Sequence, residues 1–212
     1  KINNIIKEKD ITSIRKYIVN YISNYKVENS DYSINDIMDE FINNIKTTID
    51  KEKLECSLQN ININFLCDNE NTAYFFFKNC VVKIINGKIS IISYEEISGC
   101  IWESQIISHD FSFVELKELK DFCFIKFLKN ICTLKKEDGK LEVQEDRNLS
   151  LKYIIGYLLH DYKAPSNKFA VILSESNIDG TERGRTGKGL IMQAISKLRK
   201  ITKIDGKNFT FD

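Results

Sequence analysis

The spacing of apolar residues changes along this chain of 212 residues. Between residues 3 and 50, isoleucine and tyrosine recur at steps of three and four, which predicts helices. Between residues 60 and 114, apolar side chains alternate with polar ones or form short dense runs, a pattern typical of strands. Helical spacing returns over residues 114–134. The pattern therefore predicts an α/β or α+β fold that begins with a helical N-terminal segment.

Two short motifs locate individual elements within this pattern. Ser33 precedes a helical run and has Asp36 three residues later, which predicts an N-cap at Ser33. Asn86-Gly87 separates the β-branched runs 81–85 and 88–92. Because Asn and Gly both tolerate positive φ, this dipeptide predicts a β-hairpin closed by a type I′ turn.

Further strands are expected on both sides of this hairpin, at Ile61–Phe65, Ala73–Phe77, Cys100–Trp102 and Gln105–Ile107. The aromatic run Ala73–Phe77 has two interpretations. An exposed aromatic face can stack the bases of a single strand. A buried core is the commoner role for such a run.

The last third of the chain begins with the charged stretch 135–148, which contains Asp138-Gly139 and suits a loop or linker. Asn148 or Ser150 can then cap a helix over Leu151–His160, where His160 is expected to be a structural histidine near the helix end. The apolar run Phe169–Leu173 predicts a buried strand. We divide the chain into residues 1–52, a helical segment, residues 53–134, a mixed α/β domain, and residues 135–212.

Composition and charge remove several classes of function. The formal net charge is +1, so no overall field attracts nucleic acid, although six basic residues and only two acidic ones lie between Lys188 and Asp212. The six cysteines contain no C-x-x-C pair and the two histidines are far apart, so we expect no metal site, and most cysteines suit a buried core. No apolar run is long enough for a membrane span and no signal sequence is evident, which suggests a reducing cytoplasm.

The strongest candidate for chemistry is the run Gly184-Arg-Thr-Gly-Lys-Gly189, followed by a helical pattern from Leu190. Glycines expose backbone N–H groups that can surround a di- or triphosphate, and Lys188 can reach its terminal phosphates. A strand, a glycine loop and a helix N-terminus together form a common anion site. The candidate nucleotide-binding residues are therefore Gly184, Arg185, Thr186, Gly187, Lys188, Gly189 and Leu190, with Lys188 as the candidate catalytic residue.

The run departs from the full phosphate-loop pattern G-x-x-x-x-G-K-[ST] in two positions. Glu182 stands where the first glycine belongs, and Gly189 stands where a hydroxyl would hold magnesium. The loop also begins about ten residues after the expected strand rather than directly on it. The residues alone therefore leave two interpretations, a nucleotide site or a plain glycine-rich turn with a solvated lysine.

Several separated stretches resemble the start of the helicase domain in phage and plasmid primase-helicases, which are superfamily three helicases of the AAA+ class. They are Ile155–Lys163, Ala170–Leu173, Gly184–Leu190 and Ile204–Lys207. The resemblance is strongest over residues 150–208 and weaker over residues 60–134. It makes residues 135–212 a helical lead-in and an incomplete P-loop ATPase domain.

The resemblance implies an ATP-dependent replicative DNA helicase that uses ATP and Mg²⁺, binds DNA, most simply single-stranded DNA, and forms hexameric rings. The family's later acidic motif, polar sensor and arginine finger would lie after Asp212, so we expect a fragment that binds nucleotide without turning it over. One alternative is a non-enzymatic DNA-binding or oligomer-assembly module with an incidental glycine loop. Another is a small P-loop kinase or partitioning ATPase, which would require a Ser or Thr after Lys188.

Overall fold

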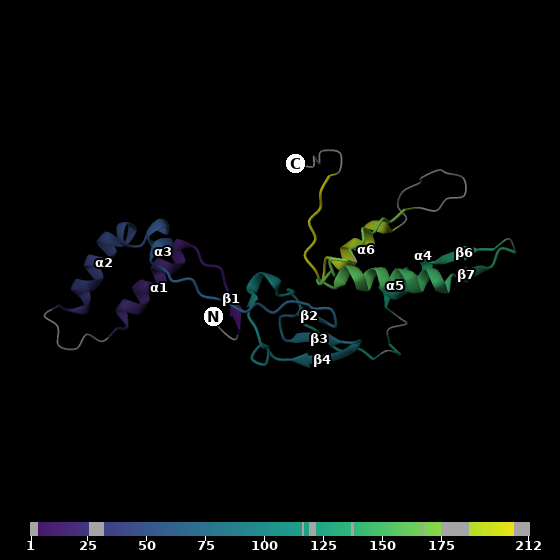
Figure 1. Ribbon diagram of the computed structural model, residues 1–212, viewed down its shortest axis with the longest axis horizontal. Coiled ribbons are helices and arrows are strands. Elements are labelled where there is room, and N and C mark those ends of the chain that lie inside the picture. Colours follow the sequence, from purple (N-terminus) through teal and green to yellow (C-terminus); the bar gives the residue numbers. More distant parts are fainter. Residues whose placement is uncertain are drawn as a thin grey trace. The chain divides into compact units, whose positions relative to one another are not determined.

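The computed structural model describes residues 4–25, 32–115, 117–118, 122–136, 138–166, 168–174 and 187–205. It separates into two compact units (Figure 1). The first unit comprises Lys1–Phe65 with Gly99–Ser104, and the second comprises Leu66–Ser98 with Gln105–Asp212. Both contain helices and small sheets, so the expected α+β class is confirmed. Within the described residues, no helix is long and apolar enough to cross a membrane.

Three helices form most of the first unit, namely α1 (Ile11–Ser23), α2 (Ile34–Thr48) and α3 (Lys51–Ser57). The predicted cap of α2 is confirmed, because the Ser33 side chain accepts the Asp36 backbone N–H and the Asp36 carboxylate accepts the Ser33 backbone N–H. The Asp10 side chain caps α1 by accepting the Ser13 N–H at 2.7 Å.

The first residues of the chain's helical pattern do not form a helix. Ile5–Ile6 is strand β1, which pairs in parallel with β5 (Ile101–Trp102). The expectation of helix is therefore wrong over the described residues 4–10, because Asp10 caps the helix that begins at Ile11. Ile101, the partner of Ile5, is fully buried, so pairing and burial outweigh the helical spacing.

A three-stranded antiparallel sheet lies at the centre of the second unit, in the order β2 (Thr72–Phe76), β3 (Val81–Ile85), β4 (Lys88–Ile92). The predicted hairpin is confirmed at both strands, and Asn86 and Gly87 have φ of 47° and 79°. The aromatic run is mainly core, as its commoner role predicts. Phe75, Phe77, Cys80 and Val82 form a buried cluster against which Leu159 and Leu198 pack.

Tyr94 closes the edge of this core. Its hydroxyl donates a hydrogen bond to the Phe77 carbonyl. Burial raises the pKa of Tyr94 to about 12. The polar end of this tyrosine is therefore satisfied inside the core and stays protonated throughout the physiological pH range.

The rest of the second unit contains α4 (Cys123–Ile131), β6 (Thr133–Lys135), β7 (Leu141–Val143), α5 (Glu145–Leu159) and α6 (Lys188–Ile195). Both α4 and α6 contact α5 (Figure 1). The expected helix over 114–134 is shorter than predicted, since helix is described only from Cys123. The stretch expected to be a loop contains the β6–β7 hairpin, which Gly139 turns with φ of 82°.

Helix α5 begins six residues before the predicted start at Leu151. Gln144 occupies the N-cap position, and Asn148, proposed as a cap, lies within the helix with 4% of its surface exposed. The acidic residues Glu145 and Asp146 lie in the first turn, where carboxylates favour a helix start. That effect explains why a charged stretch expected to be a linker forms the first turns of α5.

Three expected strands do not form. At Gln105–Ile107, Gln105 ends a 3-10 helix and only Ile107 makes an isolated bridge, to Phe77. Residues 61–64 are irregular, and Phe65 makes only an isolated bridge to Cys100. Residues 168–174 are also irregular, with 69% of Phe169 and 86% of Ile172 exposed. A strand requires a continuous hydrogen-bonded neighbour, and among the described segments none pairs with these runs beyond a single bridge.

Candidate functional site

The candidate phosphate-binding run is described from Gly187 onward, while Gly184, Arg185 and Thr186 lie outside the described residues. Gly187 is the N-cap of α6 and adopts φ of 89° and ψ of 1°, in the left-handed region. A Cβ at Gly187 would lie 2.7 Å from the Phe127 ring, so α4 packs against this backbone position. Both conditions require glycine.

Lys188 is the first residue of α6, so the described end of the run is a glycine in the left-handed region followed by a helix. The Gly187 carbonyl accepts the Leu190 N–H at 2.9 Å, which closes the first turn. No acidic residue lies in that turn, so no carboxylate of α6 neutralises the partial positive charge of the helix start. The first turn of α6 therefore contains no acidic side chain of its own that would repel an anion.

Gly189 and Leu190 border the same helix start. A Cβ at Gly189 would meet no atom within 4 Å, and 52% of Leu190 is exposed. Gly189 supplies no side-chain oxygen for a magnesium ion. Among the described residues there is also no group of three His, Cys, Asp or Glu side chains suited to a metal. These residues do not fit a protein-held magnesium site.

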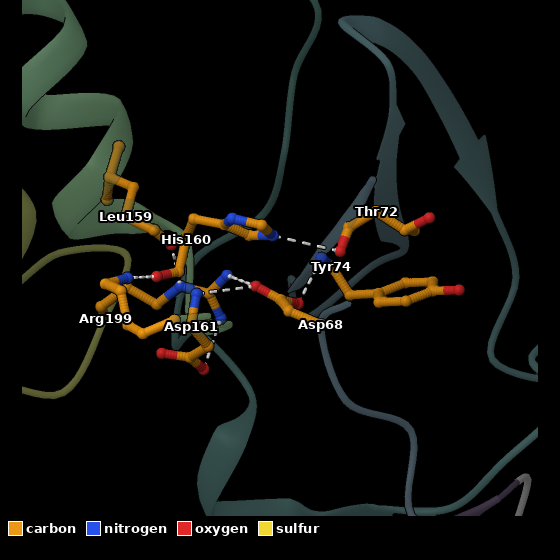
Figure 2. Close-up of polar contacts among 8 residues, drawn as sticks. Asp68, Thr72, Tyr74, Leu159, His160, Asp161 and Arg199 are labelled. Atoms are coloured by element: carbon orange, nitrogen blue, oxygen red, sulfur yellow. Dashed lines mark hydrogen bonds and ion pairs between the residues drawn. The ribbon is translucent and has the colours of Figure 1, made fainter. Parts of the chain in front are cut away.

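A buried ion-pair network lies beyond the opposite end of α6 (Figure 2). Arg199 places its guanidinium 2.8 Å from the Asp68 carboxylate and 3.2 Å from that of Asp161. Its Nε also donates to the Leu159 carbonyl at 2.6 Å. Only 14% of the Arg199 side chain and 3% of the Asp68 side chain are exposed. Arg199 therefore links the segment after α6 to the end of α5 and to the segment before β2.

The Asp68 carboxylate has partners for both oxygens. One oxygen accepts the Tyr74 backbone N–H at 2.8 Å, and the other accepts the Asp161 backbone N–H at 2.9 Å. The Arg199 guanidinium also lies 4.3 Å from the centre of the Phe75 ring. A buried carboxylate needs this full set of donors, since an unpaired one would be strongly destabilising.

His160 lies next to this network and has a structural partner, as predicted. Its Nε2 is 3.3 Å from the Thr72 carbonyl oxygen (Figure 2). The same region contains a shallow cavity of about 380 Å³ between the β2–β3 strands and the end of α5. Its lining includes Phe75, Gly156 and His160.

Nothing in the sequence marks Asp68 and Arg199 as a pair. They are 131 positions apart, and Arg199 lies in a basic stretch whose other members resemble it in sequence. Neither residue belongs to a recognisable motif. Pairs of this kind leave no signal in a single sequence, because only the folded chain brings them together.

Comparisons with known proteins give no relative. No family model matches the chain, and neither the curated proteins nor the solved structures include a significant match. The functional argument therefore rests on the residues and their geometry.

Proposed function

We propose that this chain carries the phosphate-binding part of an ATP-dependent replicative DNA helicase of the primase-helicase type, as the sequence resemblance implies. The observation that carries the proposal is the junction at Gly187-Lys188. There a glycine with φ of 89° turns the backbone directly into a helix whose first residue is the candidate lysine. This is the local geometry that a phosphate loop needs at its end.

In this proposal the backbone N–H groups at the start of α6 bind the phosphates of ATP, and Lys188 adds a positive charge near the terminal phosphate. Gly187 permits the turn, and Gly189 leaves the first helical turn without a side chain at that position. Mg²⁺ would arrive with the nucleotide and be held mainly by the phosphates, since Gly189 offers no hydroxyl. DNA and a hexameric ring of copies are the partners that the resemblance adds.

The buried network gives α6 a fixed position in this proposal. Arg199 follows α6 by four residues and is bonded to Asp68, Asp161 and Leu159. The helix itself buries Ile191 and Ile195. A helix start that binds phosphate must be held rigidly, because positioning is the main contribution of the protein to phosphoryl transfer.

A second candidate function is a DNA-binding or assembly module in which the glycine run is incidental. One observation favours it. Residues 168–174, which should include the strand before a phosphate loop, form no strand, and Phe169 and Ile172 are exposed. This candidate predicts that the chain binds DNA in a salt-sensitive manner with no response to ATP.

Binding of a fluorescent ATP analogue to Lys188→Ala separates the two candidates. Loss of a charge-assisted contact is expected to weaken binding by about 10- to 100-fold. Lys200→Ala is the matched control, because Lys200 is an exposed lysine shortly after the same helix, and it should bind like the wild type. Equal affinity of Lys188→Ala and wild type would contradict the phosphate-binding proposal.

A further inference from the structure

Three tyrosines form a regular exposed stripe along α1 and its C-terminal end. Tyr17, Tyr21 and Tyr25 are spaced four residues apart, and 70%, 60% and 56% of their surfaces are exposed. The Tyr21 and Tyr25 ring centres are 6.0 Å apart. With Asn20 and Asn24 they line a groove of about 330 Å³. We call these five residues the tyrosine stripe.

Large aromatic side chains at this exposure indicate an interaction surface. Buried tyrosine contributes strongly to stability, yet these rings contribute little to the core of the first unit. The packed face of α1 is formed by isoleucines, since Ile14, Ile18 and Ile22 are each partly buried. The tyrosine stripe therefore lies beside the packed face rather than in it.

Charge decides which partner fits the tyrosine stripe. The only charged residues between Ile11 and Tyr25 are Arg15 and Lys16, and both are cations. Arg15 is partly buried and donates to the Ile49 carbonyl at 2.9 and 2.7 Å, so the exposed Lys16 is the cation that can reach a partner of the stripe. The neighbouring groove on α2 contains the exposed Tyr32 but is lined by Asp36 and Glu40, which would repel phosphates. An anionic partner therefore fits α1 and not α2.

The remaining chemistry of the stripe matches nucleobases. Tyrosine rings stack on bases of any sequence, and asparagine amides both donate and accept hydrogen bonds at base edges. Four helical residues advance about 6 Å, roughly twice the 3.4 Å spacing of stacked nucleotides, so successive tyrosines would meet alternate bases. A helix seam would instead need apolar residues where Asn20 and Asn24 lie, since buried amides need partners.

We propose that the tyrosine stripe is a binding surface for single-stranded DNA, separate from the candidate phosphate site at Gly187-Lys188. This proposal rests on the proposed helicase function, because that function is the reason for choosing DNA as the partner. It assigns a role to a helix that contains no nucleotide-binding motif. Bases stack on Tyr17, Tyr21 and Tyr25, and Lys16 attracts the backbone phosphates. The Asn20 amide and the Asn24 Oδ1 bond the base edges, since the Asn24 Nδ2 donates to the Asn20 carbonyl at 2.7 Å.

Fluorescence anisotropy of a labelled oligothymidylate with the full chain tests the proposal. Tyr21→Ala is expected to weaken the affinity by about 5- to 100-fold, whereas Tyr21→Phe keeps the ring and should stay within about twofold. Tyr32→Ala is the matched control, because 69% of Tyr32 is exposed beside the acidic groove of the same unit. Tyr17→Ala is the second variant should Tyr21→Ala lose helix content by circular dichroism.

Sedimentation of the same variants identifies the competing occupant, a second copy of the chain. Lower DNA affinity of Tyr21→Ala with unchanged sedimentation supports the proposal. A dimer that dissociates in Tyr21→Ala while DNA affinity stays unchanged overturns it, as does equal DNA affinity of Tyr21→Ala and wild type or no DNA binding by the wild type. ATP binding is measured separately with the Lys188→Ala variant. A failed test of the phosphate site can therefore be told apart from a failed test of DNA binding at the tyrosine stripe.

Discussion

At the scale of single residues, glycine is required at Gly187 and replaceable at Gly189. A Cβ at Gly187 would lie within 2.8 Å of two atoms of the Phe127 ring, and its φ of 89° disfavours any other residue. A Cβ at Gly189 would meet no atom, and this position is helical. Replacing Gly187 is therefore expected to destabilise the fold, whereas replacing Gly189 is not.

Gly187→Ala is expected to lower the free energy of unfolding by about 1–3 kcal/mol, through strained φ and overlap with Phe127. Gly189→Ala should raise it by up to about 1 kcal/mol, because alanine is the better helix former. Urea unfolding of both variants measures the difference. A Gly187→Ala variant as stable as the wild type would show that α6 does not start at this turn.

At the scale of elements, Arg199 connects three segments that are distant in sequence. It bonds the end of α5 through Leu159, the following segment through Asp161, and the segment before β2 through Asp68. Because Asp68 is almost fully buried, removal of the guanidinium would leave a buried charge without its cation. The sheet, α5 and the segment after α6 therefore depend on one side chain.

Arg199→Leu is expected to lower the free energy of unfolding by about 3–5 kcal/mol, the usual result of breaking a buried ion pair. Lys200→Leu is the control. Lys200 is the next residue in the chain and its side chain is exposed, so this substitution should change the free energy of unfolding by less than about 0.5 kcal/mol. Chemical denaturation followed by circular dichroism gives both values. Similar stability of the two variants would contradict a stabilising role of the Asp68–Arg199 ion pair.

Elements that depend on local signals were predictable from the sequence. The Asn86-Gly87 hairpin and the Ser33 cap are each defined by residues within a few positions, and both are confirmed. Strands at 61–65, 105–107 and 169–173 were wrongly predicted, because an apolar run does not reveal whether a partner strand exists. The early start of α5 was missed because charge in its first turn looked like a linker.

At the scale of the whole molecule, the sequence could identify the end of the candidate phosphate site but not the contacts that position it. Gly187 and Lys188 lie in a short motif, so their order predicts a turn followed by a helix. Phe127 and Arg199 act on that helix from far away in the chain. The tyrosine stripe also became meaningful only when exposure was known, because its four-residue spacing alone equally suits a core.

The two proposals concern different units, since the proposed phosphate site is at the start of α6 in the second unit and the proposed DNA surface is on α1 in the first unit. They use different chemistry, since one relies on backbone N–H groups and a lysine, and the other on aromatic rings and amides. Substitutions in one should therefore leave binding at the other intact. The claim on which the helicase proposal depends is that ATP binds at the first turn of α6.

Hydrogen–deuterium exchange with and without saturating ATP and Mg²⁺ tests that claim most directly. If phosphates bind the first turn of α6, amide exchange over residues 188–191 slows on addition of ATP in the wild type, and the effect is lost in Lys188→Ala. Exchange in α2, which belongs to the first unit, is the internal control. Unchanged exchange at the start of α6 under saturating ATP, or slowing confined to another segment, would contradict the account.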